Sequence, residues 1–158
     1  MGNFKSRYLP WGELPQNIVG RISSRMWKRD LDVIPDKNVA RVEELEARYK
    51  LKIYVVTSKS HDSHKFLKYI NSHSCGKYIC VIGYSNLETT ILHEVGHAIQ
   101  SKKYKWLYLF IVGIPSAVYC FWDKVFHKKW DAKKRNEKYY SKPWEREADE
   151  LGGVHRRF

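Results

Sequence analysis

A run of seventeen uncharged residues, WLYLFIVGIPSAVYCFW at positions 106–122, most constrains what this chain can fold into. Basic segments flank it on both sides, SKKYK before it and DKVFHKKWDAKKR after it. A helix needs roughly 20 residues to cross about 30 Å of hydrocarbon, so the run is at the lower limit for a transmembrane helix. Its place in the fold therefore depends on the motifs that precede and follow it.

The pentapeptide HEVGH, residues 93–97, precedes the run. Its histidines are four residues apart, so a helix presents both imidazoles on one face, where they can bind one metal ion. Glu94 lies between them, and its carboxylate can act as general base toward a metal-bound water. Gly96 leaves one side of the helix thin, so another backbone can approach closely. A catalytic zinc ion usually has three protein ligands, and this motif supplies two.

The segment WEREADELGG, residues 144–153, follows the run and offers the third ligand. Glu145 and Asp149 are four residues apart and share a helix face. Glu145 is suited to bind the metal ion, and Asp149 to orient a ligating histidine through a hydrogen bond. Glu147 lies on a different side of this helix. The alternative interpretation is an ordinary acidic helix whose carboxylates face solvent.

The two motifs together resemble those of the gluzincin metallopeptidases, most closely the minigluzincins and the HtpX-like peptidases. The resemblance implies an α+β, zincin-like fold: a small sheet packed on the HExxH helix, and a C-terminal helix that carries the third ligand. It implies hydrolysis of peptide bonds in a peptide or protein substrate through a water activated by Zn²⁺. The roles it implies are metal ligands at His93, His97 and Glu145, general base at Glu94, and positioning acid at Asp149.

No residue securely matches the group that stabilises the transition state in that family. The donors near the second motif are Tyr139, Tyr140, Arg146 and His155. We favour His155 or a tyrosine, Tyr140 in particular, because each can donate a hydrogen bond to a developing oxyanion.

The metal motifs restrict what the apolar run can be. A single crossing of the membrane would separate His93 and His97 from Glu145, so if the three residues bind one ion, the run does not span the bilayer once. We favour a buried helix or helical hairpin, kinked at 113–115, that forms core or the wall of a substrate groove. The alternative is peripheral contact with an anionic membrane, which suits the basic flanks and the aromatic residues.

The rest of the chain is typical of one domain, 1–158, with residues 106–122 as an insertion between the metal motifs. Residues 1–35 are expected to be irregular and basic, with at most a short helix over 18–31. Loop histidines 61, 64 and 73 have no metal-ligand spacing and are expected at the surface. Helices are predicted at 37–50, from 85 or 86 onward, and from 141–143 to 152–153; strands are predicted at 51–59 and 77–84, the latter as an edge for an extended peptide.

Charge and cysteine content limit the compartment and the partners. The formal charge of +12 favours anionic surfaces, with a solvated basic surface as the alternative. Three cysteines without disulfide spacing indicate free thiols and a reducing, cytoplasmic location, with or without membrane association. The N-terminus has no signal-peptide core, and its myristoylation pattern at Gly2 is of a kind that is common by chance.

Two functions are compatible with these features. The first is a zinc-dependent metallopeptidase. The second is a non-catalytic basic protein that binds a membrane surface or nucleic acid and carries a structural or vestigial metal site. We favour the enzyme, because a structural metal ion does not need Glu94 between its ligands. Nucleic acid is not favoured, because no nucleic-acid-binding motif stands out.

Overall fold

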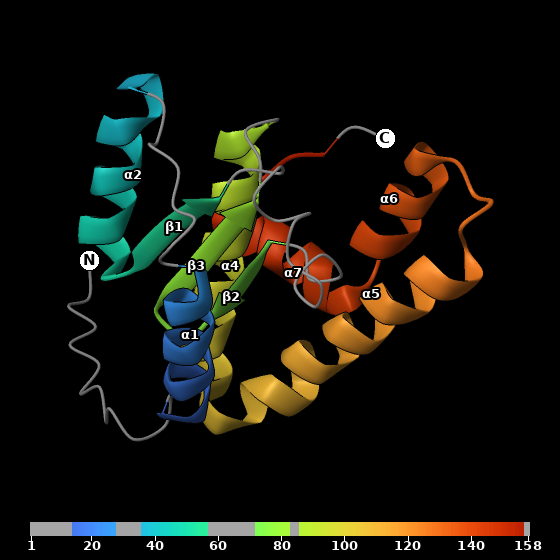
Figure 1. The fold of residues 1–158 in the computed structure, drawn as a ribbon, viewed down its shortest axis with the longest axis horizontal. Helices are drawn as coiled ribbons and strands as arrows, with labels where there is room; N and C mark the ends of the chain where they lie inside the picture. The colour runs from blue at the N-terminus through green and yellow to red at the C-terminus, as the bar shows by residue number, and fades with distance from the viewer. Residues whose placement is uncertain (1–13, 28–35, 57–71, 83–85, 157–158) are drawn as a thin grey trace, which may run out of the picture.

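The computed structural model describes residues 14–27, 36–56, 72–82 and 86–156. In this part of the chain the fold is α+β, with six α-helices and one three-stranded mixed sheet (Figure 1). The histidines at 61 and 64 lie outside the described residues. So do Gly2 and the last residues of the two predicted strands, 57–59 and 83–84. The helices are α1 (Leu14–Trp27), α2 (Asp36–Tyr49), α4 (Leu87–Tyr104), α5 (Ile114–Phe126), α6 (Ala132–Tyr140) and α7 (Pro143–Gly152).

The sheet has the strand order β1-β3-β2. Strand β1 (Lys52–Val56) pairs in parallel with β3 (Tyr78–Ile82), and β2 (His73–Cys75) pairs with β3 in the antiparallel direction. The predicted strand at 77–84 is therefore central, and the prediction that it forms a free edge is wrong. The short strand β2 takes that edge instead, because the chain reverses at Gly76, whose φ of 60° is readily adopted by glycine.

The core lies between one face of the sheet and helices α2 and α4. Ile53 and Val55 of β1 and Ile79 and Val81 of β3 alternate onto this face, as strand geometry requires. They pack against buried residues of the two helices, Val42 and Leu45 on α2 and Leu87, Ile91, Val95 and Ala98 on α4. This contact fixes helix α4, which carries HEVGH, on the sheet.

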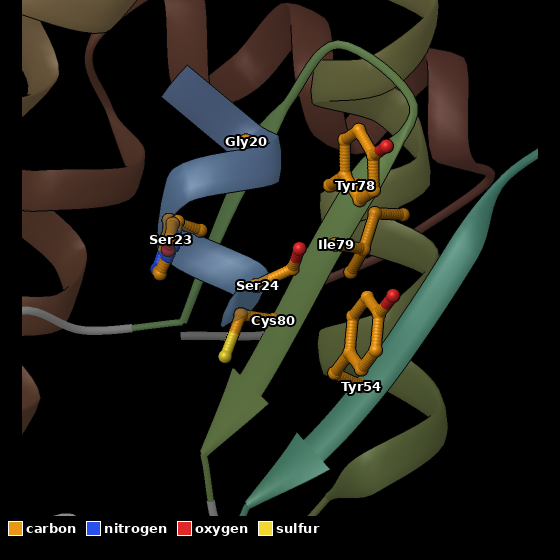
Figure 2. Close-up of a pocket in the computed structure, with 8 residues that line it drawn as sticks. Gly20, Ser23, Ser24, Tyr54, Tyr78, Ile79 and Cys80 are labelled. Atoms are coloured by element: carbon orange, nitrogen blue, oxygen red, sulfur yellow. The ribbon is translucent and has the colours of Figure 1, made fainter. Parts of the chain in front are cut away.

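Helix α1 covers the opposite face of the sheet, where it crosses β3 (Figure 2). A Cβ at Gly20 would lie 2.3 Å from the carbonyl oxygen of Cys75, so this glycine permits the close crossing. The short helix considered possible over 18–31 is present as α1, which begins earlier, so the prediction of irregular backbone is wrong for residues 14–17. Gly20 serves packing, and Pro15 occupies the tolerated first turn. The narrow gap beside α1 has essentially no space that a water molecule could occupy, so it is not a ligand site.

Helices α4 and α7 meet with almost no space between their backbones. A Cβ at Gly96 would lie 1.9 Å from the carbonyl oxygen of Ala148, and a Cβ at Gly152 would lie 2.1 Å from that of Leu92. The expected close approach at Gly96 is present. Ala148 and Gly152 are four residues apart on α7, so the close contact continues along one side of the two helices. This is the side that carries both sequence motifs.

The apolar run is helical but not buried. A 3-10 turn, η3 (Lys105–Leu107), and a π-helix, η4 (Leu109–Gly113), lead into α5. The position of the expected kink, 113–115, is the junction at which the π-helix ends and α5 begins. Of the described residues, Leu109–Phe126 is the one stretch long and apolar enough to cross a membrane. Most of its large side chains are exposed, including Phe110, Phe121 and Trp122, so the preferred prediction of a buried core helix is wrong.

Candidate metal centre

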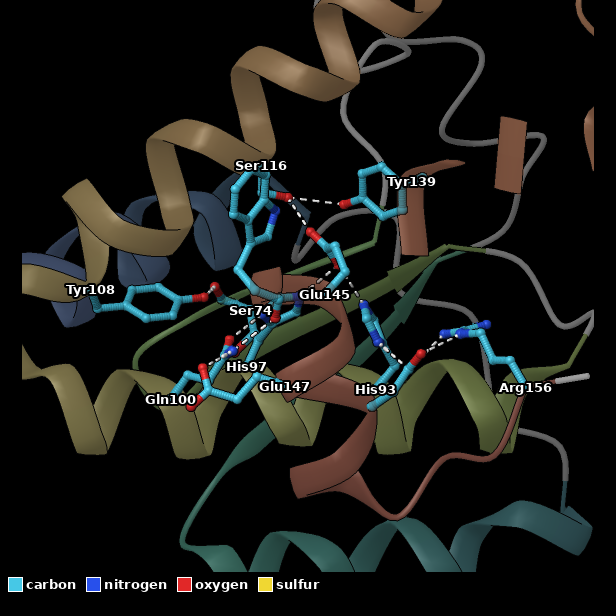
Figure 3. Close-up of polar contacts among 12 residues, drawn as sticks. Ser74, His93, His97, Gln100, Tyr108, Ser116, Tyr139, Glu145, Glu147 and Arg156 are labelled. Atoms are coloured by element: carbon cyan, nitrogen blue, oxygen red, sulfur yellow. Dashed lines mark hydrogen bonds and ion pairs between the residues drawn. The ribbon is translucent and has the colours of Figure 1, made fainter. Parts of the chain in front are cut away.

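Three buried side chains converge between α4 and α7. The Nε2 atoms of His93 and His97 lie 3.1 and 3.2 Å from the same oxygen, Oε2 of Glu145. Figure 3 shows the two imidazoles on α4 directed toward the carboxylate on α7. The structure thus brings together the three ligands predicted from the sequence, although 48 residues separate His97 from Glu145. Their candidate ligand atoms all lie within 4.8 Å of one another.

The other nitrogen of each histidine is held by a hydrogen-bond acceptor. The Nδ1 atom of His93 donates to Oδ1 of Asp149 at 2.7 Å, which is the positioning contact predicted for this acid. The Nδ1 atom of His97 donates to Oε1 of Gln100 at 2.8 Å. A neutral imidazole that carries its proton on Nδ1 has its lone pair on Nε2. In that neutral state, each Nε2 atom could bind a cation placed between the histidines and Glu145.

The partners of the histidines are themselves fixed. Arg156 donates to both carboxylate oxygens of Asp149, with Nε to Oδ2 at 2.7 Å and Nη2 to Oδ1 at 3.1 Å. The amide nitrogen of Gln100 donates to the carbonyl oxygen of Trp144 and to Glu147, which sets the orientation of the amide. Glu147 is thus turned away from the cluster, as its helix position predicted.

The third ligand has a further contact on α5. Oε1 of Glu145 accepts a hydrogen bond of 2.7 Å from the hydroxyl of Ser116, which also lies 2.9 Å from the hydroxyl of Tyr139 (Figure 3). This leaves the second carboxylate oxygen, Oε2, facing the histidines. Ser116 comes from the apolar run and therefore joins that run to the metal motifs.

The hydrogen bonds and charges within the cluster favour a bound positive charge. Burial by itself lowers the pKa of His93, but hydrogen bonds to Asp149 and Glu145 outweigh it and raise the pKa to about 9. Burial by itself raises the pKa of Glu145, but hydrogen bonds from His93 and His97 hold it well below its usual range. Without a cation, the site draws protons to the histidines. Two imidazole nitrogens and one carboxylate are also a ligand set typical of catalytic zinc sites, so the residues present fit a divalent metal ion.

Glu94 lies between the two histidines in sequence and is also buried. Its Oε2 atom has no hydrogen-bond partner among the described residues. Burial raises the pKa of Glu94, and the charges of His97, His93 and His73 oppose that rise. A buried carboxylate oxygen without a partner is costly, by about 1–3 kcal/mol or more. Such a group points to a ligand, a water or a reaction that uses it.

The candidates for oxyanion stabilisation differ in their positions. The ring of Tyr140 packs edge-on against His93, with 5.3 Å between ring centroids, and the guanidinium of Arg156 lies 3.4 Å from the centre of the same tyrosine ring. Tyr139 reaches Glu145 through Ser116. His155 and Arg146 have exposed side chains. Tyr140 is therefore the predicted donor closest to the histidines, and His155 stays a prediction.

Sequence reasoning missed three residues that support the cluster: Gln100, Ser116 and Arg156. Gln100 could have been predicted, because it follows His97 by three residues and so lies on the same helix face. No sequence pattern marks Ser116 or Arg156, because their positions depend on the packing of α5 and of the chain after α7.

The sequence matches no family model, no curated protein and no solved structure. The function proposed below is therefore inferred from the geometry of the site.

Proposed function

We propose that this chain is a zinc-dependent metallopeptidase with a zincin-like fold and a gluzincin-type ligand set. His93, His97 and Glu145 would hold the ion. A bound Zn²⁺ would supply Lewis acidity, polarising the scissile carbonyl and lowering the pKa of a coordinated water. The observation that carries the proposal is Glu94, a buried carboxylate with an unpartnered oxygen beside the ligand cluster.

The role of Glu94 in this proposal is to accept and return a proton. Because burial raises its pKa, its carboxylate binds a proton more readily than an exposed glutamate does. It takes the proton from the attacking water and passes it to the leaving amine. A purely structural metal site would gain nothing from leaving this oxygen without a partner, which favours catalysis over the non-catalytic alternative.

The substrate is proposed to bind beside β2. This strand is at the edge of the sheet and contacts α4, and an extended peptide can add to such an edge through backbone hydrogen bonds. The carbonyl oxygen of Ser74 on β2 accepts a hydrogen bond of 3.3 Å from the hydroxyl of Tyr108, which limits how far along the strand a peptide can pair. Tyr140, packed on His93, is the proposed donor to the oxyanion.

The cytoplasm is the proposed location, because Cys75, Cys80 and Cys120 are free thiols. Burial raises the pKa of Cys75 to about 11, so its thiol is a poor ligand or nucleophile at neutral pH.

The test is the Glu94→Gln variant, assayed for zinc content and for cleavage of a quenched-fluorescent peptide library. Loss of a general base lowers the rate by about 10²–10⁴-fold, while the three ligands and therefore the zinc content are unchanged. Glu88→Gln, an exposed glutamate on the same helix, is the matched control and should cleave like the wild type. Equal cleavage by the Glu94 variant would rule out the proposed mechanism.

A further inference from the structure

The helical stretch from η3 to α5 has its polarity reversed relative to a surface helix of a soluble protein. Its outward face consists of large apolar side chains at three- and four-residue spacing, with exposed fractions from 43% at Val125 to 67% at Phe121. A surface helix normally turns such a stripe toward the core. We use "outward face" for these six residues: Trp106, Phe110, Ile114, Val118, Phe121 and Val125.

The inward side of the same stretch carries the polar groups. The Tyr108 hydroxyl donates to Ser74, and Ser116 donates to Glu145. Asp123 is buried and accepts two hydrogen bonds from the guanidinium of Arg135, at 2.6 and 2.8 Å. The polar groups thus have partners inside the protein, while the apolar outward face has none among the described residues. Figure 1 shows α5 at the periphery, away from the sheet.

The surroundings of the outward face are strongly basic. Segment 102–135 contains nine Lys and Arg residues and only two acids, one of which is Asp123, already paired with Arg135. Six of the lysines are exposed, at both ends of the helical stretch: Lys103, Lys105, Lys128, Lys129, Lys133 and Lys134. An apolar face with aromatic residues and flanking lysines is the pattern of a helix that lies in a bilayer interface and contacts anionic headgroups.

We propose that the outward face docks on an anionic lipid surface, with the axis of α5 in the plane of the membrane. A crossing orientation is excluded by the contact between Ser116, in the first turns of α5, and Glu145, because it would draw the buried metal cluster into the hydrocarbon. Self-association through this face would bring together two chains of charge +12, whereas anionic lipid neutralises that charge. Docking does not depend on the peptidase activity proposed above.

One consequence concerns the metal cluster. A helix with its side chains is about 10–12 Å in diameter. Because Ser116 contacts Glu145 from the inward side of α5, docking places the cluster about one helix diameter from the lipid surface. The site then acts at the membrane surface rather than in bulk solvent.

The test is binding of the full chain to vesicles of phosphatidylcholine, with and without roughly a third phosphatidylglycerol, measured by flotation. We expect at least about tenfold stronger binding to the anionic vesicles. The double variant Ile114→Ser with Val118→Ser should weaken that binding by about tenfold or more, because two apolar side chains leave the contact. Circular dichroism checks that the helix content is unchanged.

The matched control is Ile18→Ser with Ile22→Ser on α1. These residues have the same spacing and nearly the same exposure, 50% and 56% against 51% and 59% for Ile114 and Val118. The control should bind like the wild type. Equal loss in both pairs, no loss in the α5 pair, or no binding by the wild type would overturn the proposal. So would a wild-type dimer in light scattering that the α5 pair converts to a monomer without any vesicle binding.

Discussion

The α4–α7 contact and the outward face of α5 depart in opposite ways from the usual distribution of side chains. The first buries histidines and acids, and the second exposes phenylalanine, tryptophan and valine. Buried ionisable groups and exposed apolar patches are the informative exceptions in a folded protein, because each is costly unless something compensates for it. In this chain the proposed compensation is a metal ion for the first region and a lipid surface for the second.

The two regions also differ in how tightly they are packed. At the α4–α7 contact two backbones touch, so the positions of the ligands are set by main-chain atoms. The side chains of the outward face are 43–67% exposed, so a substitution there displaces less of the surrounding protein. Substitutions should therefore be severe in the first region and mild in the second, and the following predictions test that difference.

The largest effect is expected for Gly96→Ala. Its new Cβ would lie 1.9 Å from the carbonyl oxygen of Ala148, so one helix must move away from the other. We expect a loss of about 3 kcal/mol in the free energy of unfolding, at the upper end for overpacking. The measurement is urea denaturation of the purified protein.

The matched control for that change is Gly113→Ala, at the start of α5. A Cβ at this position would lie 3.4 Å from a side-chain carbon of Leu109, and the φ of Gly113 is −60°. Alanine is the better helix former by about 1 kcal/mol, so stability should be unchanged or slightly higher. Equal destabilisation by both variants would contradict the contrast between the two regions.

A smaller effect is expected for Asp149→Asn, which weakens the hold on His93 without removing a ligand. Loss of such a supporting hydrogen bond typically lowers metal affinity by about 10–100-fold. The affinity is measured by competition with a chelating dye. Glu150→Gln, the exposed neighbour on the same helix, should leave it unchanged, and an unchanged affinity in Asp149→Asn would show that this acid does not position His93.

The smallest effect is expected for Ser116→Ala, where the two regions touch. The hydroxyl donates to Glu145, and a hydrogen bond to a charged group contributes about 1.5–3 kcal/mol at most. Because Glu145 keeps its contacts with both histidines, we expect only a several-fold loss of zinc affinity. Ser141→Ala, whose exposed hydroxyl contacts a backbone carbonyl, serves as control. A loss as large as that of Asp149→Asn would mean that α5 has a stronger influence on the site than its single contact suggests.

Much of the fold follows from local patterns in the sequence. The helix with HEVGH begins beside Asn86 as predicted, and the C-terminal helix runs from Pro143 to Gly152, where glycine with a φ of 73° at Gly153 ends it. Helix α2 follows from its apolar periodicity, and strand β1 follows from its β-branched and aromatic residues. These elements combine a clear apolar pattern with residues that start or stop a helix.

The missed elements lack such patterns. Strand β2 has three residues, and its pairing with β3 depends on a distant part of the chain. Helix α6 is polar on all sides, although its N-cap, Asp131, accepts a hydrogen bond from the backbone nitrogen of Lys134 and was a usable signal. The exposure of the apolar run was also unpredictable, because hydropathy favours burial and cannot show that the other described elements leave the run uncovered.

The site was more predictable than its surroundings. Four-residue spacing places His93 and His97 on one helix face and Glu145 and Asp149 on another. That the two faces meet was what the resemblance implied. Ser116 and Arg156 come from segments without any motif, so only the packed structure reveals them.

The central claim is that residues of α4 and α7 form one metal site. Its most direct test is the zinc content per chain after exhaustive dialysis, for the wild type, Glu145→Ala and the control Glu150→Ala. We predict about one zinc ion per chain in the wild type and the control, and much less in Glu145→Ala with its helix content preserved. Equal zinc in all three proteins, or none in the wild type, would contradict it.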